Sequence, residues 1–175
     1  LEIAKRTVTL TSADDEKVYD GQPLTNDEVT VGGDGFAANE GATYNVTGTQ
    51  TEVGSSANAF EYTLNEGTKA VNYDITVVPG TLKVTKITKE IIITAASASK
   101  KYDGSPLTND GYTYTENVLA EGDVLTAVVE GTITDFGTAE NVVTSYKVMR
   151  GEKDVTANYT FGESVKGTLA ITKRS

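Results

Sequence analysis

The chain has 175 residues, of which 38% are hydrophobic and 23% charged, and its formal net charge at pH 7 is −10. This composition is too apolar for a disordered tail and too polar for a membrane span, so we expect a soluble globular protein. The chain contains no Cys and no His, which excludes disulfides, thiolate zinc sites and cysteine nucleophiles and removes the commonest acid/base residue.

The negative charge argues against a nucleic-acid partner, because no local cluster of Lys and Arg offsets it. The first residues lack the basic, apolar and small-residue regions of a signal peptide, and no stretch approaches the roughly 18 consecutive apolar residues of a transmembrane helix. We therefore expect no membrane insertion by this fragment and any targeting elements to lie outside it.

The first six residues, LEIAKR, resemble the end of the chain. They match residues 169–174 (LAITKR) and, more loosely, residues 82–86 (LKVTK). We predict that residues 1–6 are the tail of a preceding repeat.

Short segments in which apolar residues alternate with Thr, Glu or Lys dominate the chain. This period of two is typical of half-buried strands. The clearest examples are residues 7–11, 60–64, 81–85 and 168–172. Weak helical spacing occurs only in residues 115–125, where Gly122 interrupts it, so we expect at most a turn or two of helix.

The strongest signal is an internal repeat. Residues 19–27 (YDGQPLTND) and 102–110 (YDGSPLTND) are identical at eight of nine positions, at an offset of 83. Further blocks match at offsets of 83, 86 and 87, namely residues 48–54 with 131–137, 72–73 with 158–159 and 80–82 with 167–169. Because the offset grows between matched blocks, we expect the extra residues of the second copy in connections.

The repeat predicts two modules, residues 7–87 and 91–173, joined by a short segment around residues 86–90. Several short strands in each predict an all-β chain. We expect two tandem immunoglobulin-like β-sandwich modules, with β-grasp-like modules as the alternative.

The repeated Tyr-Asp-Gly-x-Pro-Leu-Thr-Asn-Asp block predicts a turn followed by an extended segment. Gly21 and Gly104 permit positive φ, while Pro23 and Pro106 keep the residues before them out of the helical region. Short polar side chains can then bond to nearby amides in a second turn: Asn26, Asp27, Asn109 and Asp110. We interpret the block as structural; the alternative is a ligand or Ca²⁺ site, but the spacing of a calcium loop is missing.

Six tyrosines at equivalent positions are expected to be core residues with satisfied hydroxyls rather than platforms for sugars. They are Tyr19, Tyr62, Tyr73, Tyr102, Tyr146 and Tyr159.

A covalent Lys–Asn bond assisted by an acid is a further hypothesis, because three pairs of residues are equivalent in the two copies. They are Lys17 and Lys100, Asn72 and Asn158, and Asp20 and Asp103. The simpler interpretation is exposed lysines and a structural Asn-Tyr pair; loss of one ammonia per module in the intact mass would indicate the bond.

On these motifs the chain resembles the repeat modules of the MBG and YDG families of large bacterial surface adhesins. The resemblance rests on Tyr-Asp-Gly-x-Pro-Leu, Glu/Asp-x-Gly, Asn-Tyr and the closing Gly-Thr-Leu-x-Val/Ile-Thr in both copies, and it covers nearly the whole chain. It implies an extracellular location on the bacterial cell surface, secretion, and a role in a stalk or adhesive array. It supplies no catalytic residue.

The sequence thus predicts a non-catalytic tandem repeat that forms the extended, structural stalk of a cell-surface or cell-wall adhesin, with neighbouring repeats of the same chain as partners. The alternative is a direct binding module for host glycans or proteins, through the loops that differ between copies. These are residues 31–42 against 116–123, and residues 65–71 against 150–157. We predict no enzyme, no catalytic, cofactor-binding or metal-binding residue and no cofactor; Asp14, Asp15 and Glu16 are most simply a solvated turn.

Overall fold

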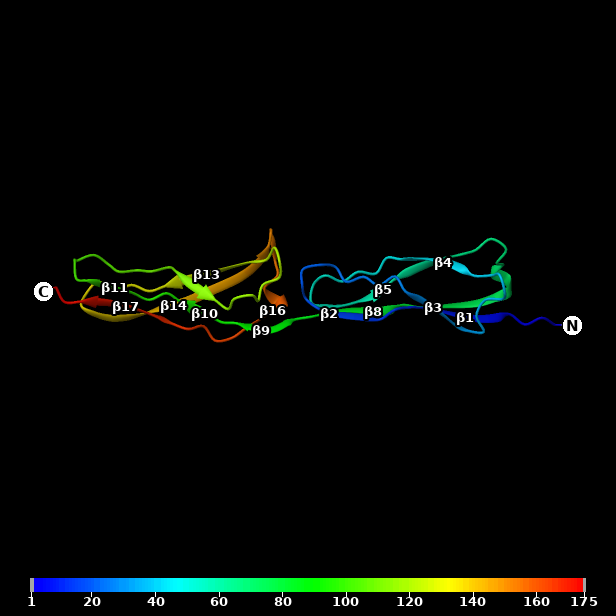
Figure 1. Cartoon of the computed structure of the whole chain (residues 1–175), viewed down its shortest axis with the longest axis horizontal. Coiled ribbons are helices and arrows are strands. Elements are labelled where there is room, and N and C mark those ends of the chain that lie inside the picture. The colour runs from blue at the N-terminus through cyan, green and yellow to red at the C-terminus, as the bar shows by residue number, and fades with distance from the viewer. Residues whose placement is uncertain (1, 175) are drawn as a thin grey trace. The chain divides into compact units, whose positions relative to one another are not determined.

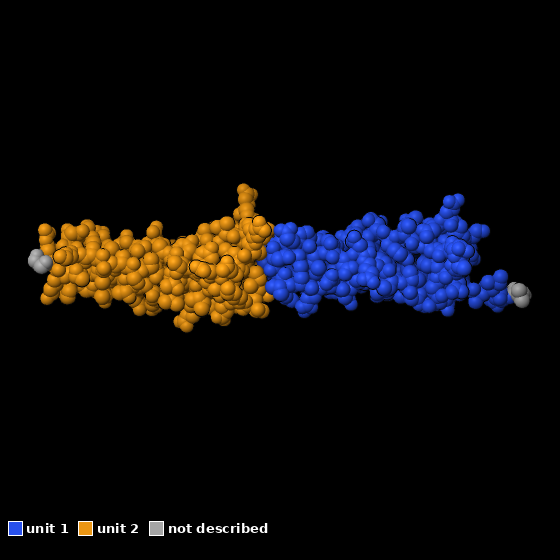
Figure 2. All heavy atoms as spheres, viewed as in Figure 1, with its two compact units in different colours: residues 1–85 blue, residues 86–175 orange. Residues whose placement is uncertain are grey.

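The computed structural model describes residues 2–174 and is almost entirely β-structure, which confirms the all-β prediction. The chain divides into two compact units, residues 1–85 and 86–175 (Figures 1 and 2). Within the described residues, helical structure is limited to two short 3-10 turns, Ala70–Asn72 and Thr156–Asn158. Across residues 2–174, none of the helical structure has the length and apolar character needed to cross a bilayer.

The first unit contains eight strands in its described part. They are β1 (Arg6–Ser12), β2 (Asp15–Val18), β3 (Val29–Gly33), β4 (Ala42–Val46), β5 (Gly54–Asn58), β6 (Phe60–Leu64), β7 (Tyr73–Val78) and β8 (Gly80–Thr85). Strand β1 pairs antiparallel with β3 and parallel with β7. Strand β2 pairs parallel with β8, which pairs antiparallel with β5, and β4 pairs antiparallel with β6.

The second unit repeats this scheme of pairing. Its described strands are β9 (Ile87–Ile91), β10 (Ile93–Ala95), β11 (Ala98–Lys101), β12 (Tyr112–Tyr114), β13 (Val124–Glu130), β14 (Gly137–Arg150), β15 (Lys153–Asp154), β16 (Tyr159–Phe161) and β17 (Gly167–Thr172). Strand β10 pairs antiparallel with β12, β9 parallel with β16, β11 parallel with β17, and β14 antiparallel with both β13 and β17.

The first and last strands of each unit run side by side in the same direction. In the first unit the parallel register begins at Arg6 opposite Tyr73 and ends at Val18 opposite Thr85. Strands β1 and β2 accordingly lie toward opposite ends of that unit (Figure 1). The chain therefore enters each unit at one end, here called the leading end, and leaves at the other, the trailing end.

The alternation of buried and unburied residues along the strands shows which side chains form the core. In β8, Gly80, Leu82 and Val84 are buried and the residues between them are not, and β17 repeats this with Gly167, Leu169 and Ile171. In the first unit the buried cluster consists of Val8, Leu10, Phe60 and Tyr73. The predicted strands 7–11, 60–64, 81–85 and 168–172 are thereby confirmed.

Two details of the strands differ from the sequence predictions. The segment predicted to join the modules, residues 86–90, lies mostly in β9, which pairs with β16 of the second unit. Strand β1 begins at Arg6, inside the predicted tail of residues 1–6, of which Leu1 lies outside the described residues. Residues 115–125 form turns and the start of β13, with Gly122 at a φ of 89°, which agrees with the prediction of at most a turn or two of helix.

The extra residues of the second copy are not all in connections. The register between β13 and β14 shifts so that Val128 faces Ser145 while Val129 faces Val143, which leaves Thr144 in a bulge. The corresponding β4–β6 pairing has no such shift. A bulge accommodates one extra residue within a strand, which explains how the offset grows inside this hairpin.

Candidate functional site

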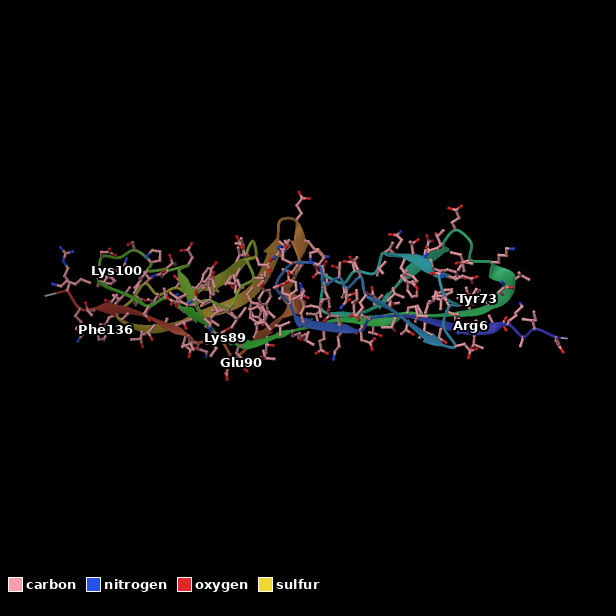
Figure 3. The ribbon with its side chains drawn as sticks, turned by 45° about the vertical axis from the view of Figure 1, so that its right-hand side comes forward. Arg6, Tyr73, Lys89, Glu90, Lys100 and Phe136 are labelled. Carbon is pink, nitrogen blue, oxygen red and sulfur yellow. The ribbon has the colours of Figure 1, made fainter. Side chains whose placement is uncertain are left out.

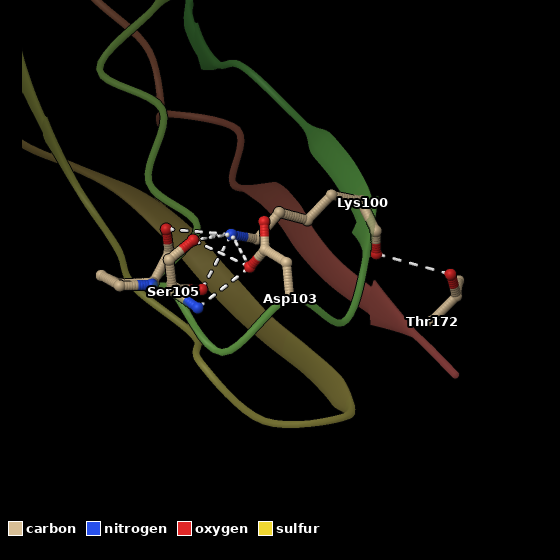
Figure 4. Close-up of polar contacts among 5 residues, drawn as sticks. Lys100, Asp103, Ser105 and Thr172 are labelled. Atoms are coloured by element: carbon tan, nitrogen blue, oxygen red, sulfur yellow. Dashed lines mark hydrogen bonds and ion pairs between the residues drawn. The ribbon is translucent and has the colours of Figure 1, made fainter. Parts of the chain in front are cut away.

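The Tyr-Asp-Gly block forms a turn at the trailing end of each unit, held by a lysine and an aspartate. Lys100 Nζ lies 2.8 Å from Asp103 Oδ1 and donates also to the Ser105 carbonyl and hydroxyl oxygens (Figure 4). In the first unit Lys17 Nζ lies 2.8 Å from Asp20 Oδ1. The turn requires positive φ at its glycine, which Gly21 at 77° and Gly104 at 78° supply as predicted.

These hydrogen bonds favour the charged form of each aspartate. Asp103 accepts from Lys100, from the Ser105 amide and from the Ser105 hydroxyl, and together they hold the pKa of Asp103 well below its usual range. Lys17 and the Gln22 amide lower the pKa of Asp20 in the same way. The lysine and aspartate are therefore occupied with fixing the turn.

The second predicted turn is present in both copies. The Asn26 side-chain oxygen accepts from the Glu28 amide at 3.0 Å, and the Asn109 oxygen accepts from the Gly111 amide at 2.9 Å. These bonds confirm the structural interpretation for the two asparagines.

Sequence reasoning missed a buried asparagine in each unit. Asn141 is 0% exposed, and its Nδ2 donates to the backbone oxygens of Ala96 and Asn109 at 2.8 and 2.7 Å. Asn58, also 0% exposed, makes the same bonds in the first unit, to Ala13 and Asn26 at 3.0 and 2.8 Å. The sequence does contain one indication of this role: Asn58 and Asn141 are equivalent at the repeat offset of 83.

A glycine accompanies each buried asparagine. A Cβ at Gly48 would lie 2.3 Å from Asn58 Oδ1, and one at Gly131 would lie 2.6 Å from Asn141 Oδ1. The amide oxygen therefore occupies the space that any other residue would need. This contact explains why Gly48 and Gly131 belong to a matched block of the repeat.

The leading end of each unit is built on a buried tyrosine and an acid. Tyr159 Oη donates to Asp123 Oδ2 at 2.5 Å and accepts from the Ala120 amide at 2.9 Å. Asp123 also forms an ion pair with Arg150 at 2.7 Å. In the first unit Tyr73 donates to Glu40 and accepts from the Ala37 amide, and the bond to Glu40 raises the pKa of Tyr73.

The structure does not bring the predicted lysine and asparagine together in either unit. Lys17 faces Val84 near the trailing end, whereas Asn72 adjoins Tyr73, which faces Arg6 at the leading end. Lys100 likewise faces Ile171, while Asn158 adjoins Tyr159, which faces Ile87. An isopeptide bond between them is therefore excluded by geometry.

The expectation of six core tyrosines is wrong for two of them. Tyr19, Tyr73 and Tyr159 are buried and Tyr62 is half-buried, but Tyr102 and Tyr146 are exposed. Tyr146 stacks on Phe161 with ring centroids 4.2 Å apart, two residues after the bulge at Thr144 in β14. Tyr102 lies at the trailing end, beside Phe136 and Lys173.

The loops that differ between the copies meet at the leading end of each unit. The Gly41 amide donates to Thr68 Oγ1 at 3.0 Å, which connects residues 31–42 with residues 65–71. In the second unit Arg150 Nη2 donates to the Glu121 oxygen at 2.9 Å. A groove of about 560 Å³ lies here in the first unit, lined in part by Arg6, Glu40 and Tyr73. Figure 3 shows Arg6 and Tyr73 close together at this end of the unit.

Acidic side chains are distributed rather than gathered. Among residues 2–174, no three acidic side chains converge in a way that could hold a metal ion. Asp14 accepts from the Thr81 amide at 2.7 Å, Asp15 from Asn26 at 3.0 Å, and Glu16 pairs with Lys83 at 3.6 Å. Asp14 and Glu16 thus connect the β2 segment with β8, while Asp15 connects β2 with the turn at Asn26.

No protein-family model, curated protein or solved structure matches the chain.

Proposed function

We propose that the two units are non-catalytic spacer modules that carry tension in the extended stalk of a bacterial cell-surface protein. The observation that carries the proposal is the parallel pairing of the first and last strands of each unit, with the chain entering at one end and leaving at the other.

This pairing determines how a pulling force is distributed. A force applied at the two ends of the chain slides β1 and β2 past β7 and β8, which loads every hydrogen bond between them at once. If the chain entered and left the unit at the same end, the hydrogen bonds between these strands would break one after another, at a lower force. The parallel register extends over six residue pairs in β1–β7 and four in β2–β8.

The same path makes each unit an efficient spacer. Residues 73–85 run from the leading to the trailing end of the first unit, which at about 3.3 Å per residue gives roughly 40 Å of reach. The resemblance to MBG and YDG repeat modules supports a place in a secreted, wall-associated adhesin array, with neighbouring repeats as partners.

Within the all-β class, we propose a two-sheet sandwich of immunoglobulin-like type for each unit. A β-grasp arrangement would need a helix packed over its sheet, and among residues 2–174 the helical structure consists of the turns Ala70–Asn72 and Thr156–Asn158. The paired strands pass from one sheet to another, since β1 and β7 belong to the sheet β3-β1-β7 and their continuations β2 and β8 to the sheet β2-β8-β5. Strands that switch sheets in this way are found in two-sheet sandwiches, which supports the proposal.

Single-molecule pulling in two geometries tests the load-bearing role. Because the chain has no Cys, handles can be attached through cysteines introduced at chosen positions. Handles at Glu2→Cys and Arg174→Cys load the strands in shear. Handles at Thr7→Cys and Asp74→Cys, which face each other across β1 and β7, peel the same strands apart. We expect the first unit to unfold at several-fold higher force in shear. Equal forces in the two geometries would overturn the proposal.

A second candidate, recognition of a host glycan or protein, is favoured by one observation: the loops that differ between copies meet beside the groove at the leading end. A glycan array and a mucin pull-down test it with the full chain and with Val71→Lys, which alters the groove lining. Binding that the variant loses supports recognition, and absence of binding removes it.

A further inference from the structure

We propose that strand β13 of the second unit is a docking edge for an extended segment of a partner protein, which adds to the sheet as a further strand. The segment has apolar side chains at alternate positions and basic residues at its ends. This role goes beyond that of a spacer, because it attaches the chain to another protein.

Strand β13 has one free edge. Among the described residues, the sheet order β11-β17-β14-β13 ends at this strand, which pairs only with β14 (Figure 1). The Val128 carbonyl accepts from Thr144 Oγ1 of β14 at 3.4 Å, so the backbone of Val128 faces β14. Because alternate residues of a strand direct their N–H and C=O groups to opposite sides, those of Ala127 and Val129 face away from β14. In the part of the chain that the structure describes, no backbone hydrogen bond covers them.

The repeat shows what distinguishes this edge. The equivalent strand β4 has five residues, whereas β13 has seven. The exposed face of β4 carries Thr43 and Asn45, and at the position of Asn45 the second unit has Val128, which is 49% exposed. Val124 lies on the same face of β13 and is 59% exposed. A long edge strand with exposed apolar side chains and no Lys or Pro lacks the features that prevent strands from pairing across their edges.

The free edge defines the chemistry of what covers it. A row of unpaired N–H and C=O groups matches the backbone of another extended chain, as in recognition by strand addition. Side chains at alternate positions of the added strand lie on one face of the sheet, where Val124 and Val128 favour apolar neighbours. A hollow of about 310 Å³ on the β13–β14 pair, lined in part by Thr126, Val128 and Ser145, provides space for one of these side chains.

The charge of the chain favours a basic partner over a second copy. Because the net charge is −10, two copies repel each other. Exposed Glu130 ends β13, and exposed Glu121 lies three residues before its start. Acidic side chains at both ends of the edge attract basic residues that flank the apolar part of the segment.

Fluorescence polarisation of a labelled synthetic peptide tests the proposal on the full chain. The peptide alternates valine with threonine over the length of β13 and carries lysines at both ends. We expect saturable binding, which Val128→Lys weakens at least about tenfold because its charge lies beside the edge. Asn45→Lys is the matched control, since it makes the same change of charge at the equivalent position of β4. It should bind the peptide like the unaltered chain.

Two changes to the backbone distinguish strand addition from contact with side chains alone. Ala127→Pro removes an N–H that faces away from β14, so it spares the ladder and should weaken binding at least about tenfold. A peptide that is N-methylated along one edge keeps its side chains but loses its donors there, and it should bind equally poorly. Melting temperatures of all variants verify folding.

Three results would overturn the proposal. The first is the absence of saturable binding at about 1 mM peptide. The second is binding that neither Ala127→Pro nor N-methylation weakens. The third is a dimer of the full chain alone, seen by sedimentation velocity and abolished by Ala127→Pro, because a second copy would then cover the edge. Since the pulling comparison measures a single chain without peptide, each of these results leaves the spacer proposal standing.

Discussion

The side chains of Asn58 and Asn141 each join two segments that are distant in the sequence. Replacing Asn141 with Ala leaves the carbonyls of Ala96 and Asn109 buried without their donor. Because an unsatisfied buried polar group costs about 1–3 kcal/mol, we expect the free energy of unfolding of the second unit to fall by about 2–5 kcal/mol. Urea denaturation followed by tyrosine fluorescence measures the loss.

Asn45 provides the matched control, since it lies in β4 and is exposed. Asn45→Ala should change stability by less than about 0.5 kcal/mol. A loss below about 1 kcal/mol in Asn141→Ala would contradict the assigned role of the buried asparagine.

The two equivalent aspartates provide an internal comparison of pKa. Asp103 accepts from the Ser105 hydroxyl as well as its amide, whereas the equivalent residue Gln22 has no hydroxyl and donates its amide to Asp20. We therefore expect the pKa of Asp103 to lie below that of Asp20, and Ser105→Gln to raise the pKa of Asp103 toward that of Asp20. Carboxyl carbon NMR across an acid titration measures both, with Asp20 in the same sample as the control.

The depressed pKa also fixes the sign of the stability change. The contribution of Asp103 is fully present above its unfolded pKa near 3.9 and is lost as the pH falls through its lower folded pKa. Asp103→Asn should therefore be less stable than the unaltered chain at pH 7, with a difference that shrinks below about pH 4. A difference that grows with acidity would contradict the pairing with Lys100.

At the scale of the strands, the backbone of each unit passes close to itself at one glycine. There the segment that contains the last strands lies directly against the segment that contains the first strands. A Cβ at Gly80 would lie 2.3 Å from the Ala13 carbonyl oxygen, and one at Gly167 would lie 2.2 Å from that of Ala96. These neighbours are backbone atoms that cannot move aside without shifting a strand. We expect Gly80→Ala to destabilise the first unit by about 3 kcal/mol, measured by urea denaturation.

Gly32→Ala is the control for this substitution, because its Cβ would meet Thr9 atoms no closer than 3.7 Å. It should leave the stability of the unit nearly unchanged. Similar losses in the two variants would show that the crossing at Gly80 is not tight.

Strands and turns could be predicted from the sequence because their causes are local. Alternation in residues 81–85 and 168–172 follows from one buried face, and positive φ at Gly21 and Gly104 follows from the turn. The contacts of Asn58 could not be predicted, since its partners lie 45 and 32 residues away and become neighbours only after the strands pair.

The tyrosines show a second limit of the sequence. Tyr19 and Tyr102 stand in nearly identical motifs, yet one is buried and the other exposed. A repeat predicts the same backbone for both copies, but the exposure of a residue at the end of a unit depends on groups outside its own motif.

At the scale of the whole molecule, each unit has its own strands and its own buried residues. End-to-end pulling should therefore give two unfolding events. About 80 residues at roughly 3.5 Å each, less a folded length of about 40 Å, predict a contour gain near 240 Å per event. Gly80→Ala should lower the force of one event and leave the other unchanged, because the crossing that it disturbs belongs to the first unit alone. A single event of twice this length, or equal weakening of both events, would mean that the units unfold as one.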